Sequence, residues 1–373
     1  MKMTMWNKYE GRTSRSLFLI ALVAMLGLFS CDPDEDMTDP GFDRVPMLTS
    51  VADDLIIPNF ESLQASVNAV SVAVDSFVQT TSVLNLISLR NAWVEAVTDH
   101  QHTSAFGFGP AELFLGPYAE VLGAFPVSET GIEQAMLDAN LDLANSFARD
   151  IRGFYAVEYL IYGNGFTDAQ IVDGFNQDRK NFLQLITAEL KTTIDNIVSE
   201  WKSSYRDEFI ASDGTAAGSS ISLYYNEFVK DYENLKNFKL ELPAGLSAGQ
   251  SGPDGSLVEA FYSGISRDLV VEHFTNSKNI WTGRSRAGQD IIGFEAYLAT
   301  VVGGPDLVTQ AREAVTRIDN AIANLPTGRL ADHVASAEVE TLRDELQANT
   351  ANFKSSTSSL LGIDITFNSG DGD

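Results

Sequence analysis

Cysteine and histidine are scarce in this sequence, and each scarcity excludes a class of site. A single cysteine among 373 residues excludes an intramolecular disulfide framework and any cysteine-rich metal site. Only four histidines are present, so a centre built from several imidazoles would need almost all of them. Basic residues are also few, since 25 lysines and arginines face 51 aspartates and glutamates, a formal charge of −26. Nucleic acid is therefore not expected as a partner, because phosphate backbones are bound by clustered positive charge.

The remaining composition is that of a globular chain that can bury a substantial core. Apolar residues make up 44% of the sequence and charged residues 20%. A length of 373 residues suffices for two domains, at roughly 100–200 residues per domain. The sequence contains no glycine-rich phosphate loop, Gly-x-Ser-x-Gly nucleophile elbow or dinucleotide-binding fingerprint. Composition therefore limits the possible classes of protein, and its function has to be inferred from individual segments.

The first thirty residues have the pattern of an export signal. Basic residues precede an apolar run over residues 17–29, which is shorter than the roughly 20 residues that a membrane-spanning helix needs. Cys31 follows the sequence Leu-Phe-Ser, and this stretch resembles the lipobox of bacterial lipoproteins, whose cysteine is lipidated. We therefore predict a signal peptide over residues 1–30 and an acyl anchor on Cys31 that attaches the protein to a membrane without spanning it. The alternative is an ordinary secretory signal with a free thiol nearby.

An acidic segment follows this cysteine. Residues 32–36 read DPDED, and such a charged, proline-bearing stretch cannot pack into a core, so it predicts a solvated tether over residues 31–48. The segment also resembles the acidic surface-export signal of lipoproteins in Bacteroidota. The expected location is the outer membrane, with the protein facing the periplasm or the cell surface.

Proline positions indicate a chain built from long helices. No proline occurs between Pro126 and Pro243, and proline is least tolerated inside helices. Apolar residues recur at three- and four-residue steps, and no run of alternating apolar and polar residues indicates a sheet. The predicted fold class is therefore all-α. Helical periodicity covers residues 55–78, 83–106, 182–201, 257–274, 308–325 and 334–353.

A glycine- and serine-rich interruption at residues 213–220 divides the helical region. We therefore predict two helical bundles that meet near this interruption. The N-terminal bundle is expected to cover residues 49–213 and the C-terminal bundle residues 214–367. A short polar tail follows at residues 368–373.

One segment is chemically unusual because it places an acid among apolar and aromatic residues. Residues 151–163 read IRGFYAVEYLIYG, and on a helix Glu158 shares its face with Phe154 and Ile161. A carboxylate desolvated in this way is costly unless it meets a cation, a metal or hydrogen-bond donors. Two interpretations remain open. The acid either pairs with a structural partner, such as an arginine or a tyrosine hydroxyl, or it belongs to a functional site, where perturbed groups concentrate.

The same segment resembles a motif of the imelysin-like family. Residues 153–160 read GFYAVEYL, which is similar to the family's Gly-x-His-x-x-Glu motif and to the Gly-x-x-Ala-x-Glu-Tyr-Leu form of many members. In this chain Tyr155 stands where the motif has its histidine. Further segments agree with the family in the same order along the chain. They are Trp93 with residues 106–110 (FGFGP), residues 232–245, and residues 258–264 (VEAFYSG).

The resemblance implies an all-helical fold of two bundle-like halves packed side by side, with Gly153, Tyr155 and Glu158 near their interface. It also implies an extracytoplasmic lipoprotein that is linked, in related proteins, to iron uptake. The family was named as a metallopeptidase, yet its motif lacks the second histidine of His-Glu-x-x-His, and here Tyr155 replaces the first. A phenol is a poor substitute for a neutral imidazole at neutral pH, although tyrosinate can bind ferric iron and haem. Peptidase activity is therefore not expected.

A second candidate metal site lies on the helix expected at residues 83–106. Glu95, Asp99 and His102 fall on one face of it, and oxygen-rich ligands at this spacing suit a hard cation. The alternative is a solvated acidic face. A similar choice, between lining a ligand cleft and packing between helices, applies to the tyrosines at positions 155, 159, 162, 224, 225, 232 and 262.

The sequence thus predicts a lipoprotein that binds a ligand and does not transform it. Glu158 and Tyr155 are expected to capture a metal ion or an iron-bearing ligand at the cleft between the two bundles. Glu158 would be the anionic ligand, and Tyr155 a hydrogen-bond donor or a phenolate ligand. The expected partners are the membrane and proteins of iron uptake. The alternatives are a zinc-type metallopeptidase and a surface interaction protein without a small ligand.

Overall fold

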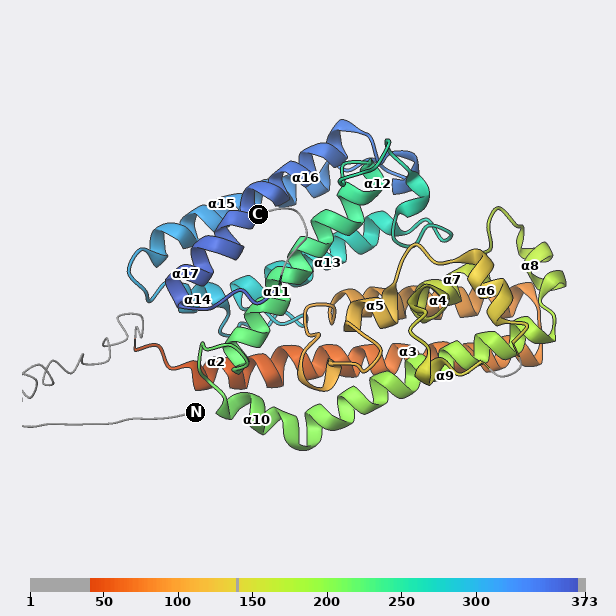
Figure 1. Cartoon of the computed structure of the whole chain (residues 1–373), viewed down its shortest axis with the longest axis horizontal. Helices are drawn as coiled ribbons and strands as arrows, with labels where there is room; N and C mark the ends of the chain where they lie inside the picture. Colours follow the sequence, from red (N-terminus) through yellow and green to blue (C-terminus); the bar gives the residue numbers. More distant parts are fainter. Residues whose placement is uncertain (1–40, 139–140, 368–373) are drawn as a thin grey trace, which may run out of the picture. The chain divides into compact units, whose positions relative to one another are not determined.

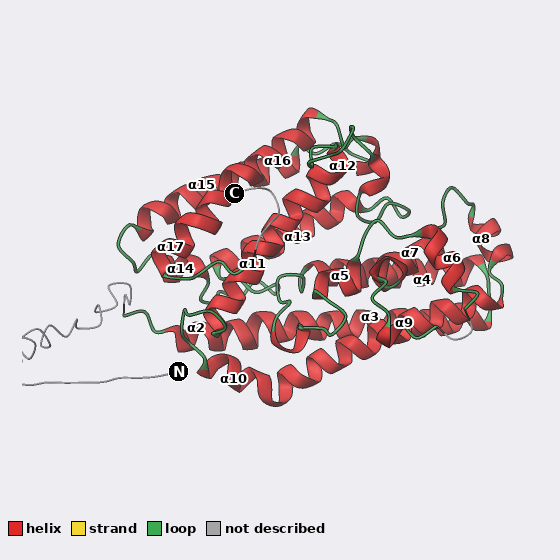
Figure 2. Cartoon of the chain, in the orientation of Figure 1, coloured by secondary structure: helices red, strands yellow, loops and turns green. Residues whose placement is uncertain are grey.

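Helices make up nearly all the regular structure in the computed structural model, which describes residues 41–138 and 141–367 (Figure 1, Figure 2). The only β pairing in these two ranges consists of isolated bridges, at Leu113–Gly116 and at Arg284–Asp290. The predicted all-α class is therefore confirmed. The predicted signal peptide, Cys31 and the polar tail lie outside the described residues. No helix in the described ranges is both long enough and apolar enough to cross a membrane.

The first group of helices, from the N-terminal side of the chain, packs around α3 (Figure 1). Helix α3 (Ile57–Gln79) contacts both α4 (Val83–Gln101) and α9 (Gln177–Glu200). Helix α7 (Gly153–Tyr162) packs against α4 and α9. The shorter helices of this group are α2 (Arg44–Val51), α5 (Tyr118–Gly123), α6 (Glu129–Ala135), α8 (Asp168–Gly174) and α10 (Arg206–Ala211).

The second group of helices begins with α11 (Ser220–Lys236), which packs against α13 (Ser266–Thr282) and α16 (Ala337–Thr350). Helix α15 (Gly304–Ala323) in turn packs against α16. Helix α13 also contacts α4, so the two groups meet there. The short helices of the second group are α12 (Leu242–Ala244), α14 (Phe294–Leu298) and α17 (Ser358–Leu361).

Wide π-helical turns extend several of these helices, and short 3₁₀ turns lie in the connecting segments. The π-helical turn η6 continues α11 and buries Lys239, which is only 6% exposed. Such turns often occur at functional sites. The π-helical turns are η1 (Ala52–Ile56), η5 (Trp201–Tyr205), η6 (Asn237–Glu241) and η9 (Ala351–Thr357). The 3₁₀ turns are η2 (Gly109–Ala111), η3 (Leu143–Asn145), η4 (Arg149–Ile151), η7 (Gly255–Leu257) and η8 (Leu330–Asp332).

Several helices begin and end at residues whose chemistry explains the boundary. The side chain of Ser82 accepts a hydrogen bond from the backbone N–H of Asn85 and so caps the start of α4. Asn176 caps the start of α9 in the same way. Helix α13 ends at Gly283, whose left-handed conformation (φ 77°) favours glycine. The helical periodicity and the local capping chemistry therefore agree.

The segment predicted as a helix over residues 257–274 is helical only from Ser266. Residues 259–264 form turns instead, and Ala260 has a positive φ of 53°, which interrupts a right-handed helix. Val258 and Ala260 are nevertheless buried. Apolar spacing was misleading here because a compact loop can bury the same residues as a helix.

The predicted tether over residues 31–48 overlaps a helix at its end. Helix α2 begins at Arg44, after Asp43, whose side chain accepts a hydrogen bond from the N–H of Val45 at 3.2 Å. Pro46 is tolerated because the first turn of a helix needs no donor at that position. Met47 and Leu48 are fully buried, so the last part of the predicted tether belongs to the core.

The predicted boundary at residue 213 falls in the loop that joins α10 to α11. The described residues from Gly41 onwards belong to one compact unit. The contact between α4 and α13 lies inside this unit. The candidate site is located close to that contact.

Candidate ligand-binding site

Helix α7 carries the acid and the tyrosine that the sequence analysis singled out. Every residue of this helix except Tyr162 is buried. Gly153 opens the helix at a φ of +73°, and a Cβ there would lie 2.2 Å from the carbonyl oxygen of Leu122, so only glycine fits. Trp93 on α4 donates a hydrogen bond from Nε1 to the carbonyl oxygen of Phe154 at 2.8 Å. The glycine of the motif therefore has a structural role, and α7 is fixed in the interior.

Glu158 is only 1% exposed, and its carboxylate already has a hydrogen-bond donor. The backbone N–H of Ser263 donates to Oε1 at 2.7 Å. Burial raises the pKa of Glu158 to about 7, although hydrogen bonds from Ser263 act in the opposite direction. Because Ser263 belongs to the loop before α13, Glu158 joins the first group of helices to the second. Glu158 is not part of the cavity wall described below.

Tyr155 reaches a second buried acid, Glu259. The Tyr155 hydroxyl donates a hydrogen bond to Oε1 of Glu259, and Nε2 of Gln101 donates to the same oxygen at 3.2 Å. The other carboxylate oxygen, Oε2, lies 2.8 Å from Nζ of Lys239, which also donates to Oε1 of Gln101. All four side chains are buried. This network joins α7, α4, η6 and the loop before α13.

The charges of Glu259 and Tyr155 depend on the side chains that contact them in this network. Burial opposes ionisation of Glu259, but the positive charge of Lys239 and the hydrogen bonds from Lys239 and Tyr155 hold its pKa below the usual value. Burial, together with the negative charge of Glu259, holds the pKa of Tyr155 well above its usual value. Tyr155 is therefore a neutral hydrogen-bond donor at neutral pH, which disfavours the phenolate alternative.

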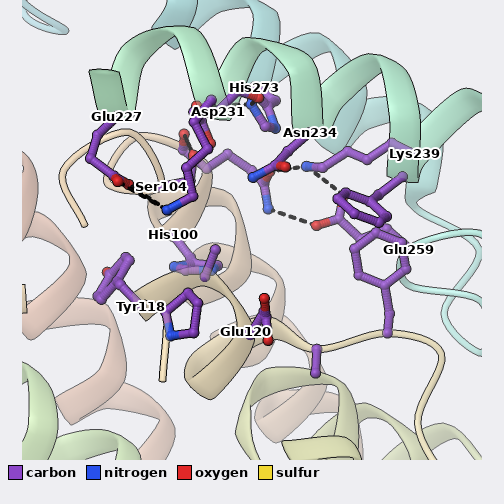
Figure 3. A pocket seen from close by; sticks show the side chains of 18 residues that line it. His100, Ser104, Tyr118, Glu120, Glu227, Asp231, Asn234, Lys239, Glu259 and His273 are labelled. Atoms are coloured by element: carbon purple, nitrogen blue, oxygen red, sulfur yellow. Dashed lines mark hydrogen bonds and ion pairs between the residues drawn. The ribbon is translucent and has the colours of Figure 1, made fainter. Parts of the chain in front are cut away.

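A cavity of about 340 Å³ adjoins this network (Figure 3). Small-molecule sites in proteins commonly have volumes of roughly 300–1,000 Å³. Gln101, Lys239 and Glu259 are part of the wall, so the motif on α7 is connected to the cavity through the hydrogen bond between Tyr155 and Glu259. The other polar residues on the wall, besides two histidines, are Ser104, Tyr118, Glu120, Glu227, Lys230, Asp231 and Asn234.

His100 lies on the cavity wall near the end of α4. Its ring packs against Phe154 and Tyr118, with ring centroids 5.1 Å and 5.5 Å away. His100 is 4% exposed, and its Nδ1 atom is buried without a hydrogen-bond partner in the part of the chain that the structure describes. Burial lowers the pKa of His100 to about 4, so the imidazole is neutral at neutral pH. A neutral imidazole of this kind can bind a metal or exchange hydrogen bonds with a ligand.

Helix α11 supplies the facing wall of the cavity, and its charged side chains are paired (Figure 3). Nζ of Lys230 lies 2.9 Å from Oε1 of Glu227. Asp231 lies 2.9 Å from Nε2 of His273, which comes from α13. Burial raises the pKa of Glu227, and the nearby Lys230 charge opposes that shift. The cavity therefore presents both positive and negative groups to a ligand.

The second predicted site is not brought together by the structure. Glu95 is exposed, Asp99 forms an ion pair with Arg286, and Nε2 of His102 lies 3.0 Å from Oε2 of Glu272. Within residues 41–138 and 141–367, no three Cys, His, Asp or Glu side chains are placed to hold a metal ion. Helical spacing put the three candidates on one face, but partners from α13 and the loop after it engage two of them separately.

The tyrosines considered as cleft residues mainly pack between helices. Tyr224, Tyr225 and Tyr232 on α11 are fully buried. The hydroxyls of Tyr225 and Tyr232 donate to backbone carbonyl oxygens, those of Phe353 and Leu346. None of the tyrosines named in the sequence analysis lines the cavity, whereas Tyr118 does.

Sequence reasoning missed most of the residues that reach the cavity. Glu259 lies in a segment that resembles the imelysin-like family, and an acid beside apolar residues was a usable signal there. Lys239 gave no such signal, because its partner Glu259 is distant in the sequence and the pair forms only in the folded chain. The sequence showed His100 only as the residue that follows Asp99, on another face of the same helix, and did not indicate that it lines a cavity.

Comparisons with known proteins relate this chain to one family. The model of the imelysin family, peptidase M75, matches residues 56–356. Iron-regulated protein A of Synechococcus elongatus is 22% identical to this chain over 232 residues. The matched region is 62% of this chain and 60% of that protein, so the chain spans less than two thirds of its relative.

Two solved structures share the fold. A protein of Parabacteroides distasonis, provisionally described as an iron-regulated protein A precursor, has a TM-score of 0.71 at 17% identity, over 89% of this chain and 97% of that one. An imelysin-like protein from Psychrobacter arcticum 273-4 has a TM-score of 0.67 at 19% identity, over 87% of this chain and 97% of that one. At these identities the likeness establishes the fold alone.

Proposed function

This chain belongs to the imelysin family, and from this premise we propose that it binds an iron-bearing ligand or a metal ion and takes part in iron uptake. The ligand occupies the cavity between α4 and α5 on one side and α11 and η6 on the other. Two similar proteins are described as iron-regulated, which supports a role connected with iron. The protein binds its ligand without transforming it.

The observation that carries this proposal is a cavity built around buried charges. Glu259 and Lys239 are 4% and 6% exposed, yet both contribute to the wall. Burying an ion pair costs free energy of desolvation, which a purely structural core avoids more cheaply with apolar residues. Charged groups held rigidly at the edge of a cavity are well suited to recognise a polar ligand.

The mixture of charges on the wall favours an iron complex over a bare metal ion. Lys230 pairs with Glu227 and Lys239 pairs with Glu259, so two of the carboxylates on the wall are already neutralised and are not free to bind a bare cation. An iron complex that carries its own oxygen ligands can accept hydrogen bonds from these ammonium groups. Hydroxyl groups of the same complex can donate to the acidic residues on the wall, which are Glu120, Glu227, Asp231 and Glu259.

Glu158 and Tyr155 act in this proposal as positioning residues. Glu158 holds the loop before α13 through the Ser263 amide, and Tyr155 holds the carboxylate of Glu259 from the same loop. Neither residue needs to touch the ligand. The motif on α7 therefore sets the position of Glu259 at the cavity wall.

The location of the protein follows from its N-terminal sequence. We infer lipidation of Cys31, which would anchor the protein to the outer membrane and expose it to the periplasm or to the cell surface. Either location is suited to passing iron to partner proteins of uptake. Metabolic labelling with a radioactive fatty acid tests the anchor, with Cys31→Ser as the variant that should lose the label.

Titration of the purified protein with ferric citrate, followed by calorimetry, tests binding at the cavity. Asn234 is half-buried on α11 and lines the cavity, so Asn234→Trp should fill part of it. We expect one site per chain in the wild type and binding at least about tenfold weaker in Asn234→Trp, the equivalent of 1.4 kcal/mol. Asn320→Trp, on an exposed position of α15, should bind as the wild type does.

The same purified proteins distinguish the two alternative functions, a surface interaction protein without a small ligand and a zinc-type metallopeptidase. Equal binding by both tryptophan variants would locate the ligand elsewhere, and a wild type that binds neither ferric citrate nor ferrous or zinc ions would favour the surface interaction protein. We expect no peptide cleavage with added zinc, because the sequence lacks His-Glu-x-x-His. Cleavage that a chelator abolishes would instead support the metallopeptidase.

A further inference from the structure

We propose that His100 supplies a nitrogen ligand to the iron of the bound complex, added to the oxygen ligands that the complex itself carries. This inference rests on the proposed function and names the contact by which the cavity recognises iron. Three observations support it. They are the different hydrogen bonding of three buried histidines, the absence of a side chain at Gly123, and the packing of the His100 ring.

The three buried histidines differ in how their ring nitrogens are engaged. Nε2 of His102 lies 3.0 Å from Glu272, and Nε2 of His273 lies 2.9 Å from Asp231. Nδ1 is buried without a hydrogen-bond partner in all three rings within the described part of the chain, so the difference lies at Nε2. Nε2 of His100 has no hydrogen bond to any described residue, and His100 lines the cavity. A ligand in the cavity supplies the partner that this nitrogen lacks.

Gly123 leaves the Nε2 side of His100 uncovered. A Cβ at position 123 would lie 3.0 Å from Nε2, closer than most real contacts. The backbone does not require glycine there, because Gly123 is not among the glycines with positive φ. Both residues line the cavity. The glycine therefore keeps open the approach to a nitrogen that faces the cavity.

The ring of His100 is held in place before any ligand arrives. Phe154 and Tyr118 pack against it, and Tyr118 is in turn fixed by a hydrogen bond of 2.8 Å to Thr103. A preorganised ligand loses little conformational freedom on binding. In the binding step, Nε2 donates its lone pair to the iron and a water or another labile oxygen ligand leaves it. No electron is transferred.

Pulsed electron paramagnetic resonance on the purified protein with bound ferric citrate tests this contact. We expect imidazole nitrogen modulation of the ferric signal in the wild type and its loss in His100→Gln. The affinity for ferric citrate should fall about tenfold or more. His102→Gln is the matched control, because His102 is equally buried but does not line the cavity, and it should keep the nitrogen signal.

A second variant keeps the histidine and blocks its approach. Gly123→Ala places a methyl group against Nε2 and should weaken ferric citrate binding and reduce the nitrogen signal while His100 remains. Circular dichroism and thermal melting establish whether each variant is folded. If His100→Gln does not fold, the affinity and the nitrogen signal of Gly123→Ala test the proposal in its place.

Two outcomes overturn the inference in distinguishable ways. A wild type that binds ferric citrate without nitrogen modulation, and a His100→Gln variant of unchanged affinity, would refute the role of His100 and leave the proposed function intact. A wild type that does not bind ferric citrate would remove the iron-binding function and this contact with it.

Discussion

Two buried glutamates near the contact between the helix groups show how differently one residue type can behave. Glu158 on α7 is 1% exposed and Glu259 before α13 is 4% exposed. Burial raises the pKa of Glu158 to about 7, because the hydrogen bonds that oppose this shift come from neutral groups and do not outweigh it. The pKa of Glu259 is lowered, because the charge of Lys239 and the hydrogen bonds to Glu259 outweigh its burial. Burial alone therefore does not decide whether a carboxylate in this protein is charged.

This comparison also separates structural from ligand-facing chemistry. Glu158 lies away from the cavity and is satisfied by the polypeptide chain itself. Glu259 lies on the cavity wall with a charged partner of opposite sign. A fixed charge at a cavity edge can act on a ligand, whereas a carboxyl group that is partly protonated at neutral pH in the interior mainly affects stability. The experiments below test this division.

The largest effect is expected for Lys239→Met, which leaves Glu259 buried without its cation. Removing one partner of a buried ion pair costs about 3–5 kcal/mol in the free energy of unfolding at pH 7. The loss should be smaller at pH 5, because the unpaired carboxylate can then take up a proton. Urea unfolding at both pH values measures these differences.

The control for this variant is Lys278→Met, whose partner Asp319 is 44% exposed at the side chain. Exposed pairs contribute only about 0–1 kcal/mol, so this change should have little effect. Equal losses in Lys239→Met and Lys278→Met would contradict the assignment of Glu259 as a charged residue that depends on Lys239.

The second prediction concerns pH and Glu158. The folded-state pKa, about 7, is above the unfolded value of 4.5, so the folded protein binds the extra proton. The contribution of Glu158 to stability is therefore fully present below pH 4.5 and is lost as pH rises to 7. The loss is about 3 kcal/mol at pH 8, from 1.36 kcal/mol per pKa unit.

Glu158→Gln should remove this slope, since the amide is neutral and its oxygen can still accept from Ser263. The variant is then more stable than the wild type at pH 8 and similar to it near pH 5. Unfolding free energies measured across this range provide the test, and the difference between the two proteins isolates Glu158 from groups such as His100. Parallel pH profiles would show that Glu158 is ionised in the folded state.

The smallest effect is expected for Tyr155→Phe, which removes one of several donors to Glu259. A hydrogen bond to a charged group contributes about 1.5 kcal/mol at the low end of its range, and Lys239 and Gln101 remain. Thermal or urea unfolding measures the loss. Tyr224→Phe is the control, because the Tyr224 hydroxyl has no hydrogen-bond partner in the described ranges, and it should cost nothing. A loss as large as that of Lys239→Met would mean that Tyr155 alone maintains the charge of Glu259.

Much of the fold could be predicted from the sequence, because helices depend on local periodicity and local capping. The segments expected at residues 55–78 and 308–325 correspond closely to α3 (Ile57–Gln79) and α15 (Gly304–Ala323). The failure at residues 257–274 arose where apolar residues are buried in a turn that includes Ala260. Periodicity reports burial on one face and does not exclude a compact loop.

The candidate site could be predicted only in part. The isolated acid at Glu158 correctly indicated a buried carboxylate. The sequence left open whether Glu158 has a structural partner or a ligand, and it gave no sign that Ser263, far along the chain, donates a hydrogen bond to it. His100 and Lys239 gave no local signal that they would line one cavity.

By itself, the sequence determined which segments are helical, that an acid is buried at position 158 and that the chain resembles the imelysin-like family. These properties depend on residues close together in the chain or on their order along it. Only the tertiary structure decided that Glu259 meets Lys239, that Ser263 satisfies Glu158, and which side chains share a cavity. Such pairings depend on how distant helices pack, and the charge of a buried group depends on the partner that packing brings to it.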